Sequence, residues 1–241
     1  MIKMEYLTMK YGKKVVLDDI NLKIQDGIHG FLGQNGSGKT TLLKILATLI
    51  KPTSGNIYIN DIPISQKKTI RSFIGYIPQE FGLYPEFACY EILDYFSLLD
   101  GVKSYKERSN NIEKVLEMVN LLDVSKEKVK NLSGGMRRRL CIAQALLSDP
   151  KLIIADEPTA NLDPAERKTI RNIFVNLKSK TSLLIASHIM DDIQDCCDSV
   201  TIMKKGKILF NGYPGQLKRN IGNCKSIESA YLELVNRDVK K

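Results

Sequence analysis

Apolar and polar positions alternate at the start of the chain, which is the pattern expected of half-buried β-strands. The alternation covers residues 2–8 and 15–24, and Tyr11-Gly12-Lys13 between them predicts a turn. We therefore expect an antiparallel sheet in this region. The next predicted elements are a short apolar strand at 28–32, a glycine-rich turn, and a helix over about 38–48.

The middle of the chain has a different periodicity. Between residues 84 and 148 the apolar side chains recur at helical spacing, with almost no strand signal. Members of this pattern are Ile112, Val115, Leu116, Val119 and Leu122. We interpret this stretch as a mostly helical insertion.

Strand-like apolar runs return after the insertion. They cover residues 152–155, 182–186 and 200–203, and a helix is predicted over 164–179. Strands that alternate with helices predict a parallel α/β core. The domains expected from this pattern are an α/β core formed by residues 1–82 and 149–241, and a helical subdomain formed by residues 83–148.

The last part of the chain is predicted to be short. A strand is expected between Gly206 and Gly212. Residues 226–239 have the pattern of one amphipathic helix. We expect no room for an appended regulatory domain.

Composition agrees with a packed globular protein. Of the 241 residues, 43% are hydrophobic and 26% are charged. No apolar run approaches the roughly 18 to 20 residues that a membrane span needs. The first residues, MIKMEYLTMKYGKK, lack the apolar centre of a secretory signal, so we expect the protein to stay in the cytoplasm.

The charge balance is positive. Lys and Arg number 36 against 27 Asp and Glu, for a net charge of +9, which permits attraction to nucleic acid, anionic lipid or a polyanionic ligand. The basic residues are dispersed, apart from residues 137–139 and the chain ends, and are not interleaved with aromatics. We therefore interpret them as solvated surface and expect no nucleic-acid partner. The cysteines are expected to be reduced and structural, and they are Cys89, Cys141, Cys196, Cys197 and Cys224.

Candidate chemistry begins with residues 33–40, GQNGSGKT, which match the phosphate-binding loop pattern between a predicted strand and a predicted helix. The glycines allow backbone N–H groups to converge on phosphate oxygens, and the helix start adds partial positive charge. Lys39 is expected to reach the β- and γ-phosphates, and the Thr40 hydroxyl is expected to bind magnesium. The sequence therefore predicts nucleotide binding.

Two adjacent carboxylates, Asp156 and Glu157, follow the apolar run at 152–155. Ligands of α/β sheets bind at the carboxyl ends of the strands. Asp156 is expected to hold the magnesium shell through water, and Glu157 to act as a general base on a water aimed at the γ-phosphate. The alternative is an acid pair that caps a strand at the surface.

A third motif, Leu132-Ser133-Gly134-Gly135-Met136, lies between these two and leads into a predicted helix over 137–147. A hydroxyl followed by two glycines at a helix N-terminus is itself an anion site. Taken alone, it also fits a Ser-capped helix with a flexible lead-in.

Together the three motifs resemble the nucleotide-binding domain of ABC transporters, and the resemblance covers essentially the whole chain. It implies an α/β fold with a P-loop NTPase core, a mostly parallel sheet, an N-terminal antiparallel β-subdomain and a helical insertion. It implies ATP and Mg²⁺ as cofactors. Four further residues match family positions: Tyr11 for adenine stacking, Gln79 for sensing magnesium and the γ-phosphate, Asp163 for the dimer-crossing loop, and His188 for γ-phosphate contact.

The implied site has three sets of residues. The catalytic set is Lys39, Gln79, Glu157 and His188. The metal set is Thr40, Gln79 and Asp156. The nucleotide-binding set is Tyr11, Gly33, Asn35, Gly36, Ser37, Gly38, Lys39, Thr40, Thr41, Ser133, Gly134, Gly135 and Asp163. For Tyr11 the alternative is an ordinary turn tyrosine.

Two positions depart from the family pattern. Met136 replaces the glutamine often found at the end of the third motif, and Asn161 stands where a small residue or glycine is common. Neither change removes a phosphate ligand. Asn tolerates a left-handed backbone, so we expect the loop to turn normally. The catalytic set is complete, which argues for hydrolysis of ATP.

The family arrangement implies partners. Two such domains dimerise head to tail, and each ATP lies between the phosphate loop of one and Ser133 and Gly135 of the other. This implies a homodimer or a pair with a second ATPase subunit, peripheral at the cytoplasmic face of the membrane, together with a separate transmembrane permease. The segment 80–87, EFGLYPEF, is rich in aromatics and is a candidate groove for a cytoplasmic helix of that permease. Alternatively, Phe81, Leu83 and Phe87 pack the helical insertion.

The expected function is therefore the ATP-binding and ATP-hydrolysing subunit of a multi-subunit ABC transporter. The stretch 74–84 and the short C-terminal part resemble bacterial exporters of peptide antibiotics, drugs or lipids. The alternatives are an importer ATPase and a soluble ABC-type ATPase of iron–sulfur cluster assembly. Translation and repair ATPases of this class have a second cassette or a long coiled coil, and this sequence has neither.

Overall fold

A six-stranded β-sheet forms the core of the structure, a computed structural model that describes residues 1–221 and 226–237. Its strands are β3 (Ile28–Leu32), β6 (Ile74–Ile77), β7 (Leu152–Asp156), β8 (Ser182–Ser187), β9 (Ser199–Lys204) and β10 (Lys207–Gly212). The strand order is β10-β9-β3-β8-β7-β6, and only β10 runs antiparallel to its neighbour within this described sheet. The predicted parallel α/β core is confirmed.

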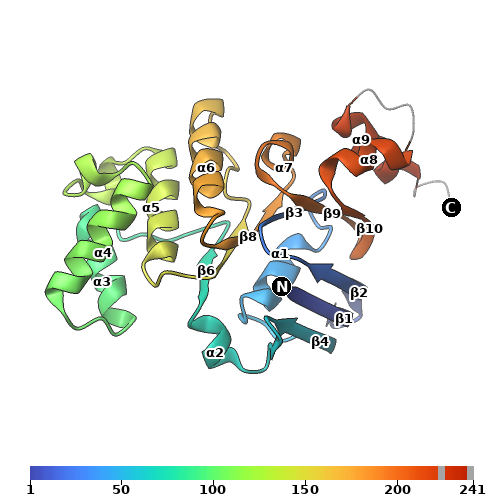
Figure 1. Cartoon of the computed structure of the whole chain (residues 1–241), viewed down its shortest axis with the longest axis horizontal. Coiled ribbons are helices and arrows are strands. Elements are labelled where there is room, and N and C mark those ends of the chain that lie inside the picture. The colour runs from blue at the N-terminus through green and yellow to red at the C-terminus, as the bar shows by residue number, and fades with distance from the viewer. Residues whose placement is uncertain (222–225, 238–241) are drawn as a thin grey trace.

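Successive residues of the inner strands face different hydrophobic cores. Leu152 and Ile154 of β7 pack on one side of the sheet, and Ile153 and Ala155 pack on the other. Helices therefore cover both faces, as the ribbon shows (Figure 1). Burial on both faces explains why these strands appear in the sequence as continuous apolar runs.

A second, antiparallel sheet of four strands has the order β2-β1-β4-β5. These strands are β1 (Ile2–Tyr11), β2 (Lys14–Ile24), β4 (Ser54–Ile59) and β5 (Ile62–Pro63). The predicted hairpin of β1 and β2 is confirmed, and Gly12 in its turn has φ 58°. β4 and β5 were not predicted.

The predicted helical insertion is confirmed at one end of the molecule (Figure 1). It contains α3 (Cys89–Leu99), α4 (Tyr105–Met118) and α5 (Gly134–Leu146), with two short 3-10 turns at Leu122–Val124 and Val129–Asn131. Helix α5 begins where the Ser133 hydroxyl accepts a hydrogen bond from the Met136 N–H at 3.1 Å, a normal N-cap. Ile112, Val115 and Leu116 are buried, as their spacing predicts.

The remaining helices connect the strands. They are α1 (Lys39–Leu46), α2 (Lys67–Arg71), α6 (Pro164–Leu177) and α7 (Met190–Cys196). The predicted helices over 38–48 and 164–179 correspond to α1 and α6, whereas α2, α7 and strand β6 were not predicted.

The described C-terminal part contains two helices: the predicted helix over 226–239 is confirmed by the second of them, whereas the first was not predicted. They are α8 (Pro214–Ile221) and α9 (Ile227–Arg237), and Leu217, Ala230 and Val235 pack them together and onto β9. The predicted helix end at residues 238–239 lies outside the described residues. Helix α8 is short and begins with Pro-Gly, so its apolar spacing is hard to distinguish from a turn.

No helix within residues 1–221 and 226–237 is long and apolar enough to cross a membrane. Of the cysteines that the structure describes, Cys89, Cys141, Cys196 and Cys197 are unpaired. Cys224 lies outside the described residues.

His29 is a buried titratable residue on the central strand β3. Its Nδ1 lies 2.7 Å from Ser199 Oγ and its Nε2 lies 2.9 Å from Thr201 Oγ1. A neutral imidazole can donate from one nitrogen and accept at the other, which satisfies both contacts. Burial lowers the pKa of His29 to about 3.

We expect His29→Gln to flatten the acid dependence of stability. An unfolded histidine takes up a proton near pH 6.5, about its ordinary pKa, whereas the folded His29 remains neutral down to a pH of about 3. The unfolded state therefore binds more protons in this window, and stability present above pH 6.5 is lost as the pH falls, by up to about 1.4 kcal/mol per pH unit. Urea denaturation from pH 7 to pH 4 measures this slope. An unchanged slope in the variant would contradict the prediction.

Candidate functional site

The candidate site is a cleft of about 660 Å³ around the segment between β3 and α1. It brings together residues from the hairpin, the glycine-rich loop, the segment after β6, and the end of β7. Its lining residues are Tyr11, Lys14, Val15, Val16, Asn35, Gly36, Ser37, Gly38, Lys39, Thr40, Thr41, Gln79, Glu157 and Lys205. The predicted residues from four distant parts of the sequence therefore meet in one cleft.

The glycine-rich loop has the conformation that its glycines permit. Gly36 and Gly38 have φ values of 78° and 108°, which other residues rarely adopt. A Cβ at Gly33 would lie 2.4 Å from the Met203 carbonyl oxygen, whereas Gly36 has open space around it. No side chain in the described residues caps the start of α1, so its first N–H groups remain available to an anion.

Lys39 is a buried cation within this loop. Its ammonium donates a hydrogen bond to the Gly33 carbonyl at 2.6 Å and lies 3.5 Å from Glu157 Oε1. Burial lowers the pKa of Lys39, and the nearby Glu157 carboxylate acts in the opposite direction. The loop thus holds a positive charge where phosphate oxygens would be received.

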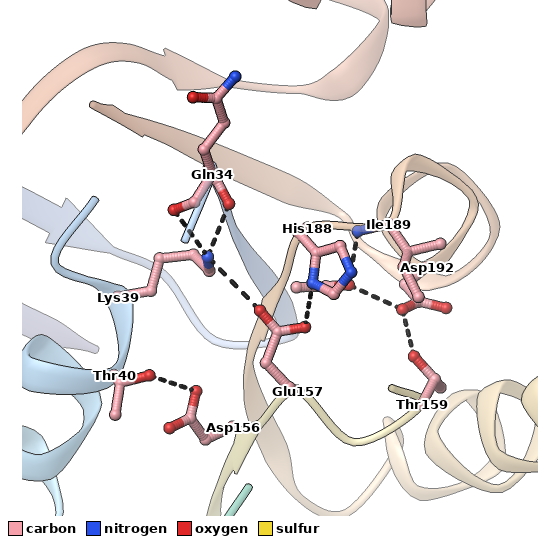
Figure 2. Close-up of polar contacts among 11 residues, drawn as sticks. Gln34, Lys39, Thr40, Asp156, Glu157, Thr159, His188, Ile189 and Asp192 are labelled. Carbon is pink, nitrogen blue, oxygen red and sulfur yellow. Dashed lines mark hydrogen bonds and ion pairs between the residues drawn. The ribbon is translucent and has the colours of Figure 1, made fainter. Parts of the chain in front are cut away.

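Thr40 and Asp156 form a second contact below the loop (Figure 2). The Thr40 hydroxyl donates to Asp156 Oδ1 at 3.1 Å, and the buried Asp156 Oδ2 has no hydrogen-bond partner among the described residues. Burial raises the pKa of Asp156, and the hydrogen bond from Thr40 opposes this shift. A carboxylate oxygen with free lone pairs beside a hydroxyl suits a hard cation such as Mg²⁺, which takes one or two such ligands beside phosphates and water.

Glu157 occupies the centre of the polar network in Figure 2. Its side chain is buried, and Oε2 lies 2.6 Å from Nδ1 of His188, whose ring is half exposed. Its backbone has φ 50°, in the left-handed region, and its N–H donates to the Ala186 carbonyl at 2.9 Å. Glu157 therefore touches both Lys39 and His188 through its two carboxylate oxygens.

The motif at residues 132–136 and Asp163 lie close together at Glu166, outside the cleft. In the described part of the chain, Ser133, Gly134, Gly135 and Asp163 do not line the cleft. Instead, a Cβ at Gly135 would lie 2.3 Å from Cδ of Glu166, and Asp163 Oδ1 accepts a hydrogen bond from the Glu166 N–H at 2.9 Å. Glu166 thus links the start of α5 to the start of α6.

The turn before α6 also follows the prediction from the sequence. Asn161 has φ 60°, so the left-handed conformation that was expected of it is present.

The interpretation of residues 137–139 as solvated surface is wrong for two of the three arginines. Arg138 and Arg139 are 6% and 9% exposed. Arg138 donates to the carbonyls of Pro78 and Gln79, at 2.9 Å each, and its guanidinium lies 4.7 Å from the ring centroid of Phe81. Carbonyl oxygens and an aromatic face replace the water that an exposed arginine would bind.

Sequence reasoning missed a second group of polar residues beside the cleft. Asp192 in α7 accepts hydrogen bonds from Thr159 and from Ser187, and it is almost completely buried. The only signals in the sequence are the positions of Thr159 and Ser187 next to Glu157 and His188. Nothing local marks Asp192, because it sits on an acidic helix that also carries Asp191 and Asp195.

Comparison with known proteins agrees with this geometry. The ABC transporter family model matches residues 17–160, which is more than half of the chain. The chain therefore belongs to the ABC transporter family. It is an ATP-binding subunit of such a transporter and an ATPase.

Individual relatives cover nearly the whole chain. Nod factor export ATP-binding protein I of Cupriavidus metallidurans is 35% identical over 230 residues, which are 94% of this chain and 76% of the relative. Bacitracin transport ATP-binding protein BcrA of Bacillus licheniformis is 40% identical over 212 residues, 86% of this chain and 68% of the relative. Among solved structures, the dimeric cassette MJ0796 in a post-hydrolysis state with ADP and phosphate has a TM-score of 0.79 at 28% identity, covering 88% of this chain and 98% of that chain.

Proposed function

We propose that this chain hydrolyses ATP for an exporter whose membrane-spanning permease is a separate subunit, and that its cargo is a peptide antibiotic, drug or lipid. The observation that carries the ATPase part is the contact of Glu157 with both Lys39 and His188 at the glycine-rich loop. The direction and the class of cargo are supported by the names of relatives that export Nod factor or transport bacitracin.

In this proposal the loop and its helix bind the phosphates. The backbone N–H groups of residues 33–41 and the Lys39 ammonium receive the phosphate oxygens. Tyr11, which lines the cleft and is 52% exposed, stacks on adenine. These contacts hold ATP with its γ-phosphate toward the end of β7.

Glu157 is then the general base. Its carboxylate accepts a proton from the attacking water, and His188 contacts the γ-phosphate from the other side of the carboxylate. Thr40, Asp156 and Gln79 would hold Mg²⁺, which neutralises charge on the phosphates when bound. The role of Lys39 is to stabilise charge as the terminal phosphoryl bond breaks.

The site is completed by a second cassette. Ser133, Gly134, Gly135 and Asp163 lie outside the cleft of their own chain, which supports a head-to-tail dimer in which they approach the nucleotide of the partner. The solved MJ0796 cassette is dimeric. Either a second copy of this chain or another ATPase subunit can fill this place.

We propose that the helices between residues 83 and 148 form the subdomain that contacts the permease at the cytoplasmic face of the membrane. Phe81 and Leu83 pack against the core, whereas Tyr84 and Phe87 are exposed. The ring centroid of Tyr84 lies 5.5 Å from the ring centroid of Phe87 and 6.2 Å from that of Tyr95, which is also exposed. This aromatic surface, formed by Tyr84, Phe87 and Tyr95, supports binding of an amphipathic helix of the permease.

Tyr84→Ala tests the assignment to a transporter with a separate permease. We expect the variant to keep the ATPase rate of the isolated chain but to lose co-purification with its permease, because an exposed aromatic anchor is removed. Tyr213→Ala is the matched control, since Tyr213 is 63% exposed and lies outside the aromatic surface. Undiminished pull-down and cargo export by the Tyr84 variant would remove the aromatic surface from the proposal.

A further inference from the structure

The buried carboxylate of Asp192 connects three segments of the chain. Asp192 lies in α7 and is 1% exposed. Its Oδ2 accepts hydrogen bonds from the Thr159 hydroxyl and, at 2.8 Å, from the Ser187 hydroxyl. Its Oδ1 lies 3.4 Å from Nη1 of Arg171 in α6. Figure 2 shows Asp192 between Thr159 and the segment that carries His188 and Ile189.

Two of these partners stand beside the proposed reacting groups. Thr159 is the second residue after Glu157, and Ser187 directly precedes His188. The Ser187 hydroxyl also accepts a hydrogen bond from the Ile189 N–H at 3.0 Å. It therefore connects Asp192 to the backbone on both sides of His188. One carboxylate oxygen thus fixes the loop after β7 relative to the loop after β8.

The two loops need such a restraint. Glu157 has φ 50°, a left-handed backbone that is strained in a non-glycine residue and persists only where surrounding contacts hold it. His188 is 47% exposed, so packing alone does not hold its ring. The hydrogen bond between His188 and Glu157 therefore depends on the placement of both backbones.

The charge of Asp192 is balanced by a cation, the guanidinium of Arg171. Arg171 faces it and also lies 3.3 Å from Asp195, whose side chain is 56% exposed. A buried carboxylate is costly unless it is paired and hydrogen-bonded, and Asp192 has both kinds of partner. Two hydroxyl donors at one oxygen also require an acceptor there, which an amide nitrogen cannot be.

We propose that Asp192 is a positioning residue for ATP hydrolysis, which holds the strained Glu157 loop and the His188 loop in the arrangement that lets the two side chains meet. This inference rests on the proposed roles of Glu157 and His188. Asp192 does not touch the cleft, so its effect is expected on the rate of the chemical step and not on nucleotide binding.

The test compares Asp192→Asn and Thr159→Val with Asp195→Asn as the matched control. Asn preserves the volume of Asp192 but replaces one carboxylate oxygen with an N–H₂ group, which faces either the two hydroxyls or the Arg171 guanidinium. Val removes one hydroxyl donor without changing the shape of the side chain. We expect kcat for ATP to fall on the order of 10- to 100-fold in both variants, as for a small misplacement of reacting groups, with KM within about twofold. The control is expected to retain the wild-type kcat.

A second readout separates positioning from general destabilisation. The sequence contains two histidines, His29 and His188, so the ring nitrogens of His188 can be followed in long-range ¹H–¹⁵N spectra. We expect the Nδ1 signal of His188 to change in Asp192→Asn and Thr159→Val and to stay unchanged in Asp195→Asn. The Thr159 variant keeps the test valid if Asp192→Asn does not fold.

The inference is overturned if Thr159→Val and any folded Asp192→Asn retain both the wild-type kcat and the His188 signal. It is also overturned if kcat falls only in parallel with the folded fraction while the His188 signal is unchanged. Failure of the underlying function gives a different result, because Glu157→Gln and His188→Ala would then hydrolyse ATP at the wild-type rate.

Discussion

Glu157→Gln is expected to bind ATP but to hydrolyse it on the order of 10²- to 10⁴-fold more slowly than the wild type, the range of general-base catalysis. The carboxamide preserves the shape of the side chain but cannot take a proton from the attacking water. Since Glu157 lines the cleft but is not part of the phosphate-binding loop, nucleotide affinity should be kept. The variant should therefore accumulate as an ATP-bound dimer.

Phosphate release and gel filtration in the presence of ATP measure these two effects. The control is Glu86→Gln, because the Glu86 side chain is 66% exposed and pairs with the surface residues Lys128 and Lys130. Wild-type turnover by the Glu157 variant would show that another group is the base. A monomer at saturating ATP would contradict the expected closure of two cassettes around the nucleotide.

Lys39→Ala is expected to weaken ATP binding on the order of 10- to 100-fold, the effect of losing a charged hydrogen bond worth about 1.5–3 kcal/mol. The Lys39 ammonium is buried in the loop, where few water molecules can replace it. Its loss also leaves the Glu157 carboxylate without the cation that now faces it at 3.5 Å, so the negative charge of Glu157 repels the incoming phosphates. Both effects act against an anionic ligand.

Titration with a fluorescent ATP analogue measures the affinity of this variant. Lys44→Ala is the control, since Lys44 lies in the same helix α1 but is exposed. Equal affinities for the Lys39 variant and the wild type would mean that the backbone N–H groups alone supply the binding energy.

Much of the α/β core could be predicted from the sequence because the residues that define each of these strands and helices are close together in the chain. The strand at 28–32 is fully buried and therefore continuously apolar, and it matches β3 at both ends. Helix α6 begins with a capping Asp163 followed by Pro164, a combination that is favourable at helix N-termini. Lys39, Thr40, Asp156 and Glu157 were found because the phosphate loop and the strand end are contiguous motifs.

The elements that were missed depend on contacts between distant residues. Strand β6 has four residues and is defined by its pairing with β7, more than seventy positions away in the sequence. Asp192 acquires its neighbours only when α7 packs beside the loops after β7 and β8. Arg138 is buried because two carbonyls and Phe81 surround it, and none of these partners is close to it in the sequence.

Arg138 links helix α5 to the segment that leads to the aromatic surface. It belongs to the helix capped by Ser133, and it donates hydrogen bonds to the carbonyls of Pro78 and Gln79, at the start of the segment that leads to the aromatic surface. If the proposed permease displaced that segment, it would have to break two hydrogen bonds and a cation–π contact or move helix α5 together with the segment. In the proposed assembly, Arg138 would therefore couple the surface that binds the permease to the helix whose Ser133 faces the nucleotide of the neighbouring cassette.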